Sequence, residues 1–217
     1  SEGATDVTQA DRAILWLKPD HIVVYDRAAT KSSDKFKRWW LQLPTPATVN
    51  GQQATMTTAQ GQQLFVTTLL PTDAVLTAIN SNEQLIQESA AADDPMQVRL
   101  RVDAPDAPQS VRFLHLLQGA AAGANADDAT LVRSVDHRFE GVIVKHLVVF
   151  FPISHEAVAE AVQYTVPAGV AKHFVTGLKP NSGYTVQTQS SGNNRQVQIT
   201  EGGSTQTDSG GLLVFAN

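Results

Sequence analysis

The chain has 217 residues, no cysteine and a formal net charge of −5, with 16 Lys and Arg against 21 Asp and Glu. This balance argues against a protein that binds a nucleic-acid backbone, which needs a clustered basic face. The lack of cysteine excludes disulfides, thiolate metal sites and a cysteine nucleophile. The sequence contains no run of about 18 apolar residues, so it predicts no membrane-spanning helix. We therefore expect neither nucleic acid nor membrane as a partner.

Alternation of apolar and polar residues with period two, typical of half-buried strands, dominates the chain. It runs through residues 96–102, where Arg99 and Arg101 occupy the polar face, and through 184–189 and 196–200. Other segments are apolar on both faces, as in a sandwich whose sheets cover each other; they are 22–25, 64–70, 113–117 and 142–151. We count roughly 14 to 16 strands. This predicts an all-β fold, a large two-sheet antiparallel β-sandwich of the super-sandwich type with little helix.

Helix and domain boundaries are less strongly indicated. One short helix is predicted over Ser154–Gln163, with Ser154 as its N-cap. Near residues 166–171 the composition changes to a tail rich in Gln, Thr, Ser and Gly. We expect residues 1–166 to form the main β-sandwich and residues 167–217 a C-terminal β-meander packed on it in the same domain, with a small separate module as the alternative. The start at Ser1, without Met or leader, predicts a processed or engineered terminus.

The six histidines are the main candidates for acid–base work near neutral pH. They are scattered, without the spacing of a metal site. His115 and His146 are each predicted to lie inside a strongly apolar strand, where a core histidine is favoured over a base or ligand. His137, in Asp136-His137-Arg138, is the most site-like, although a turn is the favoured interpretation. We predict no catalytic residue, no metal ligand and no cofactor in this chain.

Asp20 and Asp26 bracket a predicted strand, with Arg12 and Arg27 nearby in sequence. A glycosidase needs two carboxyl groups roughly 5 to 9 Å apart across a cleft. Residues six apart on a strand are separated by about 20 Å, so these two cannot form such a pair. A structural ion pair at the end of the strand is the favoured interpretation of Asp26-Arg27.

Trp39 and Trp40 are the candidate substrate-binding residues. An aromatic ring can pack against the CH face of a sugar. Adjacent residues on a strand point to opposite faces, so at most one of the two is expected in the core. Aromatic residues make up only 6% of the chain, which is sparse for a dedicated carbohydrate-binding module.

Several segments together resemble a known family. They are residues 12–27 (RAILWLKPDHIVVYDR), 39–42 (WWLQ), 64–71 (LFVTTLLP), 112–118 (RFLHLLQ), 177–180 (GLKP) and 210–215 (GGLLVF). This pattern is similar to the C-terminal β-sandwich of heparinase II/III-like polysaccharide lyases, and it extends over most of the chain.

The resemblance implies a parent protein in which a catalytic α/α toroid precedes the sandwich and acidic polysaccharide is cleaved by β-elimination. It places most of the Tyr and His acid–base residues upstream of the strand with which this chain begins. Relatives often carry a histidine after the tryptophan strand, and Gln42 stands at that position here, so no metal is carried over. A periplasmic or secreted location is expected.

Three functions are open at this point. The leading hypothesis is a non-catalytic domain that packs on a catalytic domain and walls its cleft, for which an exposed apolar patch would be the mark. The second is a free-standing carbohydrate-binding sandwich, which requires an exposed Trp39 or Trp40 beside polar groups. The third is a fragment that retains polysaccharide lyase activity.

Overall fold

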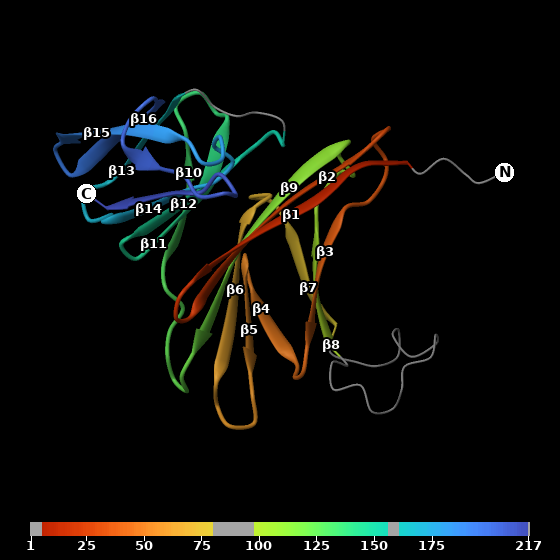
Figure 1. The fold of residues 1–217 in the computed structure, drawn as a ribbon. Helices are drawn as coiled ribbons and strands as arrows, with labels where there is room; N and C mark the ends of the chain where they lie inside the picture. Colours follow the sequence, from red (N-terminus) through yellow and green to blue (C-terminus); the bar gives the residue numbers. More distant parts are fainter. Residues whose placement is uncertain (1–5, 80–97, 156–160, 217) are drawn as a thin grey trace. The chain divides into compact units, whose positions relative to one another are not determined.

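The computed structural model describes residues 6–79, 98–155 and 161–216, and in these ranges every regular element is a β-strand. No helix long and apolar enough to cross a membrane occurs in those ranges. The chain divides into two compact units, residues 1–126 and 127–217. Each unit contains two sheets, so the predicted all-β sandwich class is confirmed, with four sheets in place of two (Figure 1).

Unit 1 pairs a six-stranded sheet with a three-stranded one. Sheet A has the order β1-β2-β9-β6-β5-β4, sheet B has the order β3-β8-β7, and all neighbours are antiparallel. Apolar side chains from both sheets meet in one core. The strands of unit 1 are β1 (Val7–Leu17), β2 (His21–Thr30), β3 (Arg38–Leu43), β4 (Ala47–Asn50), β5 (Gln53–Thr57), β6 (Gln63–Leu70), β7 (Val75–Ile79), β8 (Val98–Asp103) and β9 (Ser110–Ala120).

The period-two pattern places the core of unit 1 as predicted. On β8, Val98, Leu100 and Val102 are buried, whereas Arg99 and Arg101 lie on the opposite face. The first two residues of that predicted stretch, 96 and 97, are outside the described residues. β9 is buried along most of its length, as expected for a strand with two neighbours in the middle of a sheet.

Unit 2 is a second sandwich. Sheet C has the order β10-β11-β12-β14-β18 and sheet D the order β13-β16-β15-β17, with β12 and β14 parallel and the other pairs antiparallel. Its core contains apolar residues of both sheets. The strands of unit 2 are β10 (Ala129–Arg133), β11 (Phe139–Val144), β12 (Leu147–Pro152), β13 (Ala161–Pro167), β14 (Lys172–Val175), β15 (Gly183–Ser191), β16 (Asn194–Glu201), β17 (Thr205–Gln206) and β18 (Leu213–Ala216).

Two local predictions need correction. The predicted domain division at 166/167 falls inside unit 2, because β13 pairs with β16 and the polar tail supplies strands to both sheets of that unit. The sequence becomes rich in polar residues there because the strands of the tail have a solvent-facing side, and the hydrophobic core of unit 2 continues through them. Of the predicted helix over 154–163, residues 156–160 lie outside the described residues, and 161–163 are strand, paired with 198–200.

Candidate functional site

The two adjacent tryptophans lie on opposite faces of β3. Trp39 is 3% exposed and belongs to the core of unit 1, where its ring lies 4.0 Å from the His115 ring, centroid to centroid. Trp40 is 38% exposed, on the outer face of sheet B. Of the predicted pair, only Trp40 therefore presents an accessible ring to a ligand at the surface.

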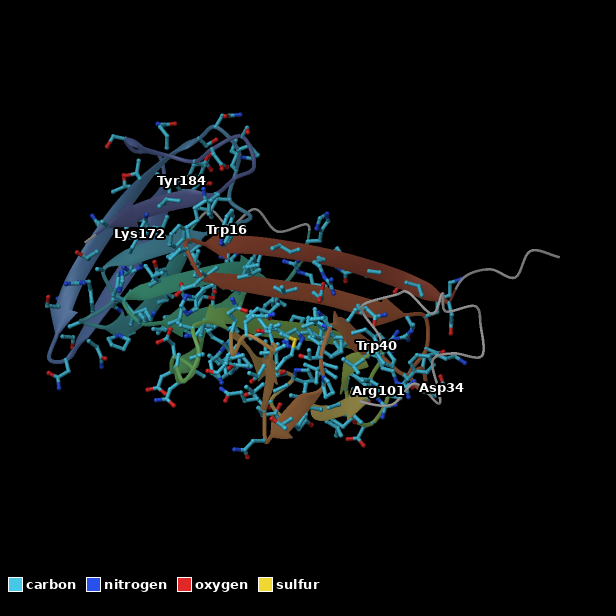
Figure 2. The ribbon with its side chains drawn as sticks, turned by 90° about the horizontal axis from the view of Figure 1, so that it is seen from below. Trp16, Asp34, Trp40, Arg101, Lys172 and Tyr184 are labelled. Atoms are coloured by element: carbon cyan, nitrogen blue, oxygen red, sulfur yellow. The ribbon has the colours of Figure 1, made fainter. Side chains whose placement is uncertain are left out.

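Arginines of β8 flank Trp40. In the strand register Trp40 lies directly opposite Arg101, and Arg99 lies opposite Gln42 two residues further along. The Arg99 guanidinium carbon is 5.7 Å from the centre of the Trp40 ring, which is within cation–π range. Figure 2 shows Trp40 and Arg101 in the same part of unit 1. Side chains directly opposite on neighbouring strands share a face.

A third arginine lies at the end of the same face. Arg38 Nε contacts an oxygen of Asp103 at 2.5 Å, and Arg101 Nε contacts the other oxygen at 2.7 Å. The Arg38 guanidinium carbon is also 4.4 Å from the centre of the exposed Phe36 ring. One carboxylate thus aligns two guanidinium groups, and three positive charges stand against one negative charge on a chain whose net charge is −5.

This outer face of sheet B, defined by Phe36, Arg38, Trp40, Arg99 and Arg101, combines two kinds of recognition chemistry. Guanidinium groups pair with carboxylate and sulfate-like oxyanions through parallel N–H donors. An exposed indole ring packs against the CH face of a sugar. The combination fits an anionic carbohydrate better than a neutral one, because a neutral ligand would desolvate three guanidinium groups that have one carboxylate, Asp103, among them.

The charged residues of β1 and β2 form structural pairs. Arg12 donates two hydrogen bonds to Asp26, at 2.6 and 3.0 Å, and Arg27 donates one to Asp11 at 2.6 Å. Each pair is directly opposite in the strand register. Asp26 and Arg27 therefore lie inside β2, not at its end, and each forms an ion pair with a residue of β1. Asp20 contacts His21 Nδ1 at 2.7 Å.

His115 is sealed in the core of unit 1. Its ring is fully buried on β9, and Nδ1 is 3.1 Å from the hydroxyl of Thr68. Burial, with a smaller contribution from the positive charge of Arg12, lowers the pKa of His115 to about 3. The ring is therefore neutral at physiological pH and shielded from any substrate, which fits the predicted core histidine.

A tyrosine and a histidine meet in the core of unit 2. Tyr164 Oη and His173 Nδ1 are 2.8 Å apart, and both residues are 0% exposed. Burial raises the pKa of the Tyr164 hydroxyl, and burial together with the charge of Arg195 lowers the pKa of His173 to about 4. Stacking of His173 on Phe215, with ring centres 4.5 Å apart, completes the packing. The pair is enclosed by apolar side chains and stays neutral.

Two of the other histidines, His137 and His146, lie at turns. His146 follows β11 in an exposed turn and not in a strand, because the apolar stretch across 142–151 is two strands joined at 145–146. His137 lies in the turn before β11 with φ of 56°, as the turn interpretation anticipated. Beside it, burial opposes ionisation of Asp136, but hydrogen bonds from Ser134 and Arg138 outweigh that effect and lower the pKa of Asp136.

No cluster of three or more His, Asp or Glu side chains suited to a metal occurs among residues 6–79, 98–155 and 161–216. Gln42, which stands where the resembled family often carries a histidine, is an exposed residue of β3 opposite Arg99. The arginines beside Trp40 were missed by sequence reasoning as site residues. Their alternation on β8 was visible, but only strand pairing shows that β8 lies beside β3.

Comparison with known proteins gives a fold and no closer relationship. No family model matches the chain, and no curated protein matches it. The crystal structure of the heparan sulfate lyase HepC from Pedobacter heparinus is similar, with a TM-score of 0.50, 13% identity and coverage of 68% of this chain. A mutant of that lyase matches with a TM-score of 0.49, the same identity and the same coverage. This chain spans 24% of the length of either lyase chain. The chain therefore has a heparinase-like fold.

Proposed function

We propose that this chain is a non-catalytic β-sandwich domain of a larger polysaccharide-lyase-like protein, where it packs on a catalytic domain and walls its cleft. The observation that carries this proposal is the burial of the histidine and tyrosine side chains that lie in the two sandwich cores. His115, His173 and Tyr164 are all buried in sandwich cores and held neutral, so each contributes to packing and none can exchange a proton with a polysaccharide. The similarity in fold to a lyase of which this chain spans 24% supports the same proposal.

An exposed apolar strip on sheet A offers a docking surface for that second domain. Ile14 is 61% exposed, Trp16 58% and Ile22 36%. Ile14 lies opposite Val24 and Trp16 opposite Ile22, so all three side chains share the face that carries the unit 1 core. Figure 2 shows Trp16 on β1. Contiguous apolar side chains at a surface are typical of interaction sites, and we propose the catalytic domain of the same protein as the occupant.

Thiol labelling tests the docking proposal, since the chain has no cysteine of its own. Ile14→Cys should react rapidly with a maleimide in this chain alone and slowly in the longer protein that contains the catalytic domain. Val135→Cys, at an exposed turn position in unit 2, is the control and should react at similar rates in both. Equal labelling of Ile14→Cys in the two proteins would contradict docking at this strip.

A second function, carbohydrate binding, is favoured by the outer face of sheet B. Trp40 is exposed there beside Arg99 and Arg101, the arrangement that a carbohydrate-binding sandwich requires. We propose an acidic polysaccharide as the ligand, because its carboxylate or sulfate groups match the guanidinium groups. The two functions are compatible, since a domain that walls a cleft can also hold the polymer.

Calorimetric titration with heparan sulfate tests the binding proposal. Trp40→Ala should weaken binding by about 1 kcal/mol or more through loss of the stacking ring. Arg99→Gln should weaken it and also flatten its salt dependence, because fewer counter-ions are then released. Val75→Ala, at an exposed position of β7 on the same sheet face but without charge or ring, is the control. Equal affinity of wild type and Trp40→Ala would reject this face as the site.

A further inference from the structure

The outer face of sheet D carries mainly amide and hydroxyl side chains and no charged one. The inner residues of the same strands, among them Tyr164, Tyr184 and Val197, are buried in the core of unit 2. The residues that alternate with them point outward and come from β13, β15 and β16. In sequence order they are Ala161, Gln163, Thr165, Pro167, Thr185, Gln187, Gln189, Ser191, Asn194, Gln196, Gln198 and Thr200.

The strand register arranges the glutamines in rows across the sheet. Gln163 lies opposite Gln198, which lies opposite Gln187 on the other side. In the next row Gln196 lies between Thr165 and Gln189. Paired side chains in neighbouring strands are about 5 Å apart at Cβ, so the amides form a continuous field about three strands wide.

These amides are free to bind. Across the described residues, none of the five glutamine side chains of these rows is hydrogen-bonded within the chain. Each side-chain amide can donate two hydrogen bonds and accept two. Exposed sheet faces ordinarily carry interspersed Lys, Arg, Asp and Glu. On this face, by contrast, the central position is occupied by an uncharged and exposed residue, Gln198.

The part of this face that carries the glutamines is concave. A depression of about 470 Å³ is lined by six residues of β13, β15 and β16. This volume is within the range of small-ligand sites. The residues of its lining are Gln163, Gln187, Thr188, Gln189, Gln196 and Gln198.

We propose that this hollow, the glutamine face, is a binding site for a neutral, polyhydroxylated ligand, a chain of uncharged sugar units. Hydroxyl groups both donate and accept hydrogen bonds, as amides do, so every ligand hydroxyl finds a partner. An anion or cation would lose its hydration without gaining a counter-charge, which opposes binding. The face carries no aromatic ring, so recognition rests on the hydroxyl edges of the sugars. This site differs from the outer face of sheet B: it is formed by other residues, it lies in unit 2, and its ligand is uncharged.

Nuclear magnetic resonance of the full chain tests the proposal, with the side-chain NH2 signals of the glutamines as the readout. The probes are neutral hexasaccharides of glucose, mannose and xylose, added to millimolar concentration, and a heparan sulfate hexasaccharide as the charged comparison. We expect at least one neutral hexasaccharide to shift the signals of Gln163, Gln187 and Gln198. Gln198→Glu, an isosteric change at an exposed position, should weaken that binding about three- to tenfold.

Gln60→Glu, in the exposed turn between β5 and β6 of unit 1, is the matched control and should leave the binding unchanged. The proposal is overturned if no neutral hexasaccharide shifts these signals, or if Gln198→Glu binds as wild type does. It is also overturned if heparan sulfate shifts the same amides more strongly than the neutral sugars. Shifts that depend on protein concentration alone would identify the face as a contact between two copies, again against the proposal.

Discussion

The burial of His115 predicts that unit 1 loses stability in mild acid. In the folded chain the pKa of this histidine is lowered to about 3 by burial and by Arg12, whereas the unfolded chain has the ordinary value near 6.5. The unfolded state therefore binds the proton first as the pH falls. Stability from this group is fully present above about pH 6.5 and is lost as the pH falls toward 3.

The size of the effect follows from the two pKa values. At pH 5 the unfolded histidine is almost entirely protonated, and the folded one is almost entirely neutral. One pKa unit corresponds to about 1.4 kcal/mol, so the free energy of unfolding should fall by about 2 kcal/mol between pH 7 and pH 5 on account of His115. That amount is a large fraction of the stability of an ordinary domain.

Tryptophan fluorescence isolates unit 1 in a denaturant titration, because all three tryptophans of the chain, at 16, 39 and 40, belong to that unit. His115→Leu removes the titrating group, so its free energy of unfolding should decline by about 2 kcal/mol less than that of wild type between pH 7 and pH 5. His146→Leu, at an exposed turn of unit 2, is the control and should follow wild type.

An identical decline in wild type and His115→Leu would refute the reasoning. A second measurement keeps the test decisive if the variant does not fold. The ring signals of His115 in the wild-type chain should not titrate between pH 7 and pH 5. A titration midpoint near 6.5 would show that the ring is not sealed in the core.

Three further predictions follow from packing and hydrogen bonding. Trp39→Ala should cost about 3 to 5 kcal/mol in thermal or denaturant unfolding and Trp40→Ala less than about 1, because only Trp39 is buried in the core; equal losses would contradict the face assignment. Gly141→Ala should destabilise unit 2 by about 2 kcal/mol or more, since its Cβ would lie 1.7 Å from the Val149 carbonyl oxygen. The Cβ of Gly169→Ala would meet nothing within 4 Å, so this variant should change stability by less than about 0.5 kcal/mol. Tyr164→Phe should cost about 1 kcal/mol in the unfolding of unit 2 through loss of the hydrogen bond to His173, and an unchanged midpoint would show that this bond adds no stability.

Local pattern was sufficient for the fold class, because side chains of a strand alternate whatever its partners are. The stretch over 98–102 was predicted to alternate and does, and the separation of Trp39 from Trp40 follows from the same geometry. Division into two units could not be predicted in this way. It depends on which strands pair, and the polar tail that suggested a boundary at 166/167 in fact completes the sheets of unit 2.

The candidate site was only partly predictable for a related reason. Trp40 could be identified as a surface aromatic from its place next to Trp39. That Arg101 lies opposite it depends on the pairing of β3 with β8, which are separated by more than fifty residues of sequence. The sequence pattern predicts a strand at His146, because a turn of two polar residues inside an apolar run resembles a single long strand.

The most direct test of the non-catalytic role is a lyase assay on the chain itself. Cleavage of a uronate polysaccharide by β-elimination leaves an unsaturated sugar that absorbs in the ultraviolet. With heparan sulfate and other uronate polysaccharides in excess, we predict no rise in absorbance above the protein-free control. A rise that scales with the concentration of the chain, and that follows the chain through successive purification steps, would contradict it.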